Sequence, residues 1–155
     1  MKQSLAIAIL LLHCTQAFAS GEGEFTRHNL GIFLGGTNAP HYDTEFTWGV
    51  EYGFRFTPHV GVGIVYEETD EGHGGDGTEV WVANIYVNPF SNWRLGLGAG
   101  EEEIGGSHGH TETLYRASAA YHIHVGKFAI SPMVAVDRID GDNTYVFGAA
   151  FSRPF

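Results

Sequence analysis

Apolar and polar side chains alternate strictly between Glu45 and Phe56, where the sequence reads EFTWGVEYGFRF. One parity carries only large apolar side chains, and the other carries glycine, threonine and charges of both signs. Successive side chains of a β-strand point to opposite faces, so the segment is predicted to be a strand with one wholly apolar face. Its length is close to that of a bilayer-crossing strand, which needs about 9–11 tilted residues. The glycines and mixed charges of the second face suit the crowded inside of a narrow closed barrel.

The same alternation recurs in seven further segments. We expect strands at residues 29–36, 45–56, 60–67, 79–88, 93–101, 113–125, 128–137 and 144–155. The segment 79–88 is the most ambiguous, because Val80 and Val82 are apolar as well; we place Trp81 and Ile85 on its outward face. Pro132 lacks the N–H that a ladder hydrogen bond requires, so we expect a β-bulge at that residue.

The connections between these strands alternate in length. Residues 57–59, 88–92 and 126–127 form short turns, whereas 37–44, 68–78 and 102–112 are longer, polar and rich in glycine, and 138–143 is intermediate. Short turns at one end and long loops at the other are typical of outer-membrane barrels. The predicted fold class is therefore all-β: an eight-stranded antiparallel up-and-down transmembrane β-barrel, with both termini in the periplasm.

The N-terminus has the pattern of a secretory signal peptide. Lys2 precedes a short apolar run at residues 5–12, and residues 17–19 (AFA) form a small-residue cleavage site. The apolar run is too short for a transmembrane helix. We expect residues 1–19 to be removed, leaving residues 20–155 as one barrel domain in the bacterial outer membrane. The single cysteine, Cys14, lies in the signal, which excludes disulfide and thiol chemistry from the mature chain.

The chain resembles the small eight-stranded outer-membrane β-barrels, the OmpA-like and OmpX-like family. The resemblance covers nearly all of residues 20–155 and rests on the phrase GVEYGFRFTPHVGVGIVYE, the terminal Phe155 and the alternation of Tyr145, Phe147 and Phe151 before it. Arg153 departs from the family pattern, which has an apolar residue there. The resemblance implies a monomer embedded in outer-membrane lipid and lipopolysaccharide, with the Phe155 strand recognised by the barrel assembly machinery.

Acidic residues dominate the charge of the chain. Asp and Glu number 18 against 8 Lys and Arg, for a formal charge of −10. Nucleic acid is an improbable partner, because its phosphates attract basic surfaces. We map most of the carboxylates to the extracellular rim or loops: Asp43, Glu67, Glu68, Asp70, Glu71, Asp76, Glu101, Glu102, Glu103, Glu112, Asp137, Asp140 and Asp142.

Four charged residues take the inward parity instead: Glu51, Arg55, Arg94 and Arg116. A charge in a dry lumen costs several kcal/mol unless it is paired, so we expect Glu51 to form an ion pair with at least one of these arginines. The pattern admits a gated ion or proton path, but a structural core plugged by salt bridges is the favoured interpretation. His122 and His124 also point inward, where they could hold a metal or serve as hydrogen-bonded filler.

The glycine-rich loops combine imidazole with carboxylate groups, both of which are metal ligands. We propose a candidate divalent-metal site for Zn, Cu or Ni, formed by His73, Asp76, His108, His110 and Glu112. No compact ligand motif such as H-E-x-x-H is present, so solvated acidic loops are the alternative. No other cofactor is expected.

Three functions remain open at this point. The first is a non-enzymatic surface barrel that supports the envelope or binds an extracellular ligand through acidic, His-rich loops. The second is metal capture by those loops. The third is a lipid A-modifying enzyme, for which Ser107, His108 and Glu112 are the candidate triad. Adjacent residues on a strand point apart, and Ser118 and Ser131 lack a His-x-Ser partner, so we expect no enzymatic activity.

Overall fold

The structure is a computed structural model that describes residues 26–70, 77–90, 92–107 and 109–155. The signal peptide expected at residues 1–19 lies outside the described residues, as do His73, Asp76 and His108. The described strands are β1 (His28–Asn38), β2 (Glu45–Arg55), β3 (Val60–Thr69), β4 (Thr78–Phe90), β5 (Trp93–Ile104), β6 (His110–Tyr121), β7 (Ile123–Val125), β8 (Phe128–Ile139) and β9 (Asp142–Pro154). The described part contains no helix long and apolar enough to cross a membrane.

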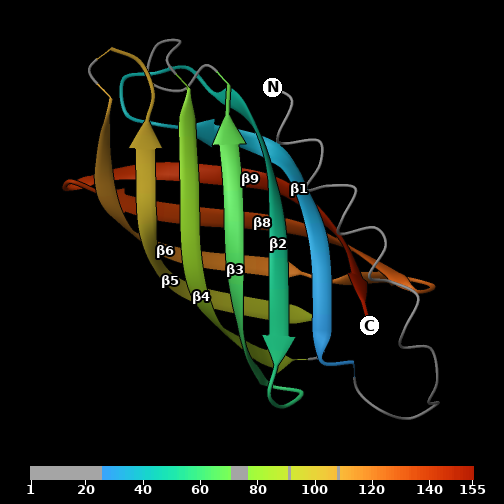
Figure 1. The fold of residues 1–155 in the computed structure, drawn as a ribbon. Helices are drawn as coiled ribbons and strands as arrows, with labels where there is room; N and C mark the ends of the chain where they lie inside the picture. The colour runs from blue at the N-terminus through green and yellow to red at the C-terminus, as the bar shows by residue number, and fades with distance from the viewer. Residues whose placement is uncertain (1–25, 71–76, 91, 108) are drawn as a thin grey trace.

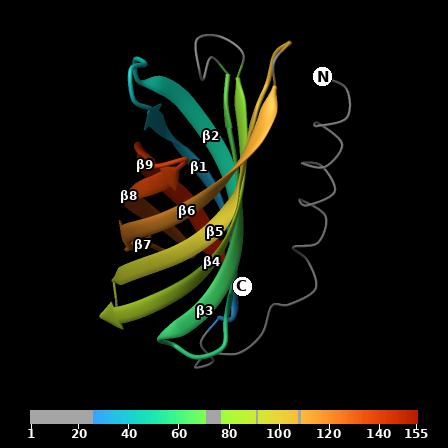
Figure 2. The same ribbon diagram turned by 90° about the vertical axis from the view of Figure 1, so that its left-hand side faces the viewer.

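The strands form one closed antiparallel barrel. From β1 to β6 each strand pairs with the next one in the chain, β8 pairs with β6, β7 and β9, and β9 closes the barrel by pairing with β1. β6 and β7 are two parts of one long strand of the barrel wall. Counting them as one, the barrel has eight wall strands, which we call staves, and the predicted fold class is confirmed. Figures 1 and 2 show the strands tilted around a single lumen, with β9 closing against β1.

The sixth stave is interrupted at His122. Ala120 pairs with Met133 and Ile123 pairs with Ile130, so the register is unchanged across the interruption and there is no bulge. The expected bulge at Pro132 is therefore wrong. Because proline has no backbone N–H, inter-strand hydrogen bonds are lost at this position, but no extra residue is inserted into either strand.

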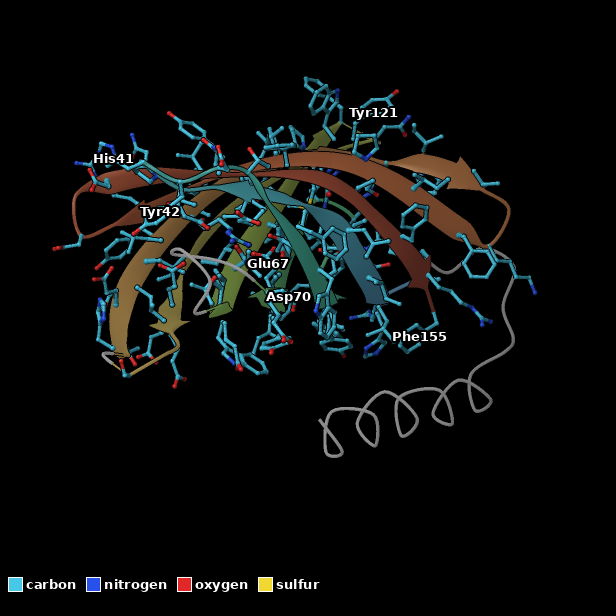
Figure 3. The ribbon with its side chains drawn as sticks, turned by 90° about the horizontal axis from the view of Figure 1, so that it is seen from above. His41, Tyr42, Glu67, Asp70, Tyr121 and Phe155 are labelled. Atoms are coloured by element: carbon cyan, nitrogen blue, oxygen red, sulfur yellow. The ribbon has the colours of Figure 1, made fainter. Side chains whose placement is uncertain are left out.

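The predicted sidedness of the strands holds along β1 to β6, β8 and β9, whereas all three residues of β7, among them the inward-predicted His124, are exposed. Along β4, exposed and buried residues alternate from Thr78 to Val87, with Trp81 and Ile85 exposed and Val80 and Val82 buried. Exposed aromatic and aliphatic side chains cover the outside of every other stave as well: Ile32, Phe46, Ile64, Leu97, Tyr115, Val134 and Phe147 are examples. Figure 3 views the barrel from above, with Glu67 inside the ring of strands and Tyr121 and Phe155 at its edge.

The lumen is filled by apolar as well as polar side chains. Val65, Val80, Val82, Leu114 and Ile139 pack together inside the loop half of the barrel. A second group of Phe33, Ala135 and Val146 packs beside Met133. Leu114 is completely buried and Val82 is 1% exposed, so this layer is closed to solvent.

Turns and loops separate the two ends of the barrel. We call the end with the connections at residues 56–59, 91–92 and 126–127 the turn end, and the opposite end the loop end. The connection expected at residues 138–143 is shorter than predicted, because β8 and β9 are joined by only Asp140 and Gly141. Both residues have positive φ, 44° and 96°, as a two-residue type I′ hairpin requires.

Candidate functional site

The lumen holds two separate ion-pair clusters. The one nearer the turn end joins Glu51 of β2 to Arg94 of β5, which donates two hydrogen bonds to the carboxylate at 3.0 and 2.9 Å. Asn29 donates a longer bond, 3.4 Å, to the same carboxylate. The guanidinium of Arg94 also lies 4.6 Å from the centre of the Tyr86 ring, within cation–π range. This bidentate pair therefore bridges opposite sides of the barrel with both charges compensated.

The second cluster, which we call the Arg116 triad, comprises Arg116, Glu67 and Asp137. Arg116 of β6 donates to Glu67 of β3 at 2.9 and 2.6 Å and to Asp137 of β8 at 2.7 and 2.6 Å. All three side chains are at most 3% exposed. One arginine thus binds two carboxylates, so the triad keeps one formal negative charge, and it links β3 to the neighbouring strands β6 and β8.

Three carboxylates expected at the extracellular rim lie inside the lumen instead. Glu67, Glu102 and Asp137 are 3%, 4% and 2% exposed. Glu67 and Asp137 are the last residues of the predicted strands 60–67 and 128–137 and take their inward parity. Glu102 lies beyond the predicted strand 93–101, and β5 continues to Ile104, which extends the inward parity to it. Glu68, Glu79 and Glu103 keep the outward parity and face the loop-end rim, where Glu79 is the cross-strand partner of both of the others.

Arg55 contacts the segment that precedes β1. It lies at the turn end of β2, where its guanidinium donates to the carbonyl oxygen of Thr26 at 3.1 and 2.8 Å. It helps to line a small cavity of about 60 Å³ at that end, together with Arg94, His122 and His124. A cavity of this size has room for a few water molecules and is too small for a drug-sized ligand.

The two inward histidines differ in their surroundings. His122 is partly buried, and its Nδ1 lies 2.7 Å from the hydroxyl of Ser131, whereas His124 is exposed. Sequence reasoning gave Ser131 no histidine partner, because His122 comes from the neighbouring stave and not from a His-x-Ser motif. The contact lies where the pairing of β6 and β7 with β8 is interrupted, beside Pro132. Because the serine is 1% exposed, its hydroxyl is not accessible to a substrate.

Part of the predicted metal site can be located at the loop end. His110 and Glu112 lie on β6, not in a loop, and His110 Nε2 contacts a Glu112 carboxylate oxygen at 2.8 Å. Glu102 is the cross-strand partner of Glu112. Within the described ranges, no group of three or more histidine, cysteine or acidic side chains is arranged to hold a metal ion. The other three candidate ligands lie outside those ranges, and so does His108 of the candidate catalytic triad.

The inward parity of each strand, followed to the strand ends seen in the structure, predicts the lumen positions of the three carboxylates that were assigned to the rim from the sequence. Gly61 and Gly63 set the inward parity of β3, and the same parity includes Glu67. Asp137 is the cross-strand partner of Arg116, in the register set by the short turn at residues 126–127. No short-range signal indicates the contact between Arg116 and Glu67, because β3 and β6 are not neighbours in the barrel.

Comparison with known proteins supports the fold and leaves the family unassigned. No family model matches the chain, and no curated protein matches it either. Among solved structures, the N-terminal β-barrel domain of Pseudomonas aeruginosa OprF is similar with a TM-score of 0.56 and 14% identity, over 84% of this chain and 100% of that one. Neisserial surface protein A has a TM-score of 0.55 and 10% identity, over 83% and 96%.

A third similar structure is the Yersinia pestis outer membrane protein Ail in a phospholipid bilayer nanodisc. Its TM-score is 0.54 at 16% identity, and the match covers 83% of this chain and 99% of Ail. At these identities the likeness establishes a common fold alone. The shared architecture is the small closed β-barrel, and it agrees with the strand pairing described above.

Proposed function

We propose that this protein is a non-enzymatic integral barrel of the bacterial outer membrane, with its acidic loop end facing the exterior. The observation that carries the proposal is the sidedness of the wall. Leu97 and Ile85 are 69% and 61% exposed on the outside, while the Arg116 triad is buried within. Soluble monomers rarely expose a continuous apolar surface of more than a few hundred Å², whereas a bilayer requires one.

The packing of the lumen favours a structural or binding role over transport. Among the described residues, the apolar layer around Leu114 and Val82 and the two ion-pair clusters fill much of the lumen, and the cavity between Arg94 and Arg116 measures about 20 Å³. A hydrated ion would have to break the bidentate ion pairs of Arg94 and Arg116, whose side chains are buried in the lumen. We therefore assign the barrel to envelope integrity or to binding of a surface ligand through its loops.

The chemistry of the loop end narrows the class of partner. Glu68, Glu79 and Glu103 line a rim depression of about 230 Å³ with Asp70, so cationic groups are the complementary ligands. Lipopolysaccharide is itself anionic, and contact with it would require divalent cations shared between its phosphates and these carboxylates.

The proposal is tested by folding residues 20–155 into phospholipid vesicles and recording planar-bilayer currents. We expect a heat-modifiable band on gels, resistance of the strands to protease, and no reproducible single-channel openings. Steady openings would overturn the sealed-lumen assignment. A polypeptide that stays monomeric in buffer without detergent would overturn membrane integration itself.

A second candidate function is capture of a divalent transition metal at the loop end. The favouring observation is the contact between His110 and Glu112, which places an imidazole and a carboxylate within one coordination sphere. Ligands from the loops, including His73, Asp76 and His108, would complete the site. Affinity would fall as the pH drops below about 6.5, because protonated imidazole cannot bind a metal.

Titration calorimetry with zinc on the folded barrel tests this candidate. We expect His110→Ala and Glu112→Gln to weaken binding at least about tenfold, while His59→Ala at the turn end leaves it unchanged. If zinc produces the same heat with His110→Ala as with the wild-type protein, metal capture by this site is refuted.

A further inference from the structure

The charges of the barrel are strongly polarised along its axis. Among the described residues, every Asp and Glu except Glu51 lies in a loop or in the loop half of its strand. Glu51 is inside the lumen and binds Arg94. The basic side chains show the opposite trend, since Arg27, Arg55, Arg94, Lys127 and Arg153 all lie in the turn half. An acidic protein therefore presents a basic rim at its turn end.

Two of these cations lie next to Phe128, Lys127 before it in the chain and Arg153 across from it on β9. Lys127 is exposed in the turn that precedes β8, and Phe128 is the first residue of that strand. The register of β8 and β9 pairs Ala129 with Ser152, which places Arg153 directly opposite Phe128. The guanidinium of Arg153 lies 6.0 Å from the centre of the Phe128 ring. We call Lys127, Phe128 and Arg153 the basic turn patch.

The basic turn patch adjoins an apolar wall. Phe128 is 57% exposed, and Ile123 and Val125 of the adjacent β7 are also exposed. An exposed ring flanked by two long cationic side chains is the arrangement expected at a membrane interface. There the stems of lysine and arginine lie along apolar surface and their charged ends reach the headgroups.

We propose that the basic turn patch binds the phosphate headgroup of an anionic phospholipid in the membrane leaflet at the turn end. This inference rests on the proposed function, because it requires the barrel wall to be embedded in lipid. Phe128 and the exposed β7 side chains contact the acyl chains, while Lys127 and Arg153 contact the phosphodiester. An acidic side chain close to the patch would compete for the two cations. Glu51, the one described Asp or Glu in the turn half, lies in the lumen and is bound to Arg94.

The experiment measures lipid preference at the patch with a local fluorescent reporter. Trp48, Trp81 and Trp93 are replaced by Phe, and Phe128→Trp places one tryptophan in the patch. The protein is folded into vesicles that contain either brominated phosphatidylglycerol or brominated phosphatidylcholine, and quenching gives the relative association constants. Each surface cation attracts an anionic lipid with an energy that corresponds to about a fivefold preference, so phosphatidylglycerol should be favoured by at least about that factor.

The controls separate the headgroup from other sources of charge. Lys127→Gln with Arg153→Gln should reduce the ratio to about one, whereas Arg138→Gln, a cation at the loop end, should leave it unchanged. Raising the salt to about 0.5 M should lower the ratio, and free inorganic phosphate should compete no better than chloride at equal ionic strength. A ratio near one in the parent protein overturns the inference, as does a preference that survives the double substitution.

A failure of the proposed function would look different. A chain that does not enter vesicles gives no heat-modifiable band and no quenching by either lipid. Equal quenching by both lipids in a well-folded barrel contradicts only the headgroup site. If peptidoglycan fragments change the emission of the reporter while both lipids quench equally, the patch is a cell-wall contact and the lipid assignment is wrong.

Discussion

Replacing Arg116 with methionine should destabilise the barrel more than any surface substitution. The change removes four charge-assisted hydrogen bonds and leaves Glu67 and Asp137 facing each other, both at most 3% exposed. Deleting one partner of a buried ion pair costs about 3–5 kcal/mol, and here two carboxylates lose their partner at once. We expect a loss of at least about 3 kcal/mol in the free energy of unfolding at pH 8.

The assay is urea unfolding of the barrel in lipid vesicles, followed by tryptophan fluorescence and gel mobility. Arg138→Met is the matched control, because Arg138 is exposed and bonds only to Asn143 at 3.2 Å among the described residues. Its loss should cost less than about 1 kcal/mol. Adding Glu67→Gln and Asp137→Asn to the methionine variant should recover part of the stability, since the two carboxylates left without a partner are then neutral. Equal effects of the Arg116 and Arg138 substitutions would refute the reasoning.

Two further substitutions test the packing and the lipid-facing wall. Gly100→Ala should cost about 1–3 kcal/mol in unfolding free energy, because its Cβ would collide with the Trp81 carbonyl oxygen. Gly53→Ala, whose nearest neighbouring heavy atom is 3.8 Å away, should cost less than about 0.5 kcal/mol in the same urea titration. Ile85→Arg on the outer face of β4 should cost about 2–4 kcal/mol in vesicles, and Phe90→Arg at the turn end about 0–1, so similar costs would contradict a bilayer around the wall.

The alternation of apolar and polar residues was sufficient to predict the barrel because the two faces of each strand have different surroundings. One face contacts lipid, and the other faces the packed lumen. Even β4, with apolar residues on both parities, follows the prediction. Val80 and Val82 turn inward to join the buried layer around Leu114, and Trp81 and Ile85 turn outward. The pattern could not separate a lipid-facing valine from one that fills the lumen, since both environments are apolar.

The ion pairs were only partly accessible from the sequence. Inward parity identified Glu51, Arg94 and Arg116 as lumen residues, and Glu51 binds Arg94. The partners of Arg116, Glu67 and Asp137, were assigned to the rim because they are the last residues of the predicted strands, although both take the inward parity. Which charges meet depends on how far each stave is shifted along its neighbour, and this shift accumulates around the barrel. The alternation of residues within one strand does not give this accumulated shift.

The central claim is that the outward parity of each strand contacts hydrocarbon while the inward parity fills a sealed lumen. Residues 20–155 contain no cysteine, so single cysteines along β4 can carry spin labels. Collision rates with oxygen, which partitions into lipid, and with a water-soluble nickel complex should be measured at positions 82–87. We predict high oxygen and low nickel accessibility at Ala83, Ile85 and Val87, with low accessibility to both reagents at Val82 and Asn84. Rates that fail to alternate, or nickel access at Ile85, would contradict the account.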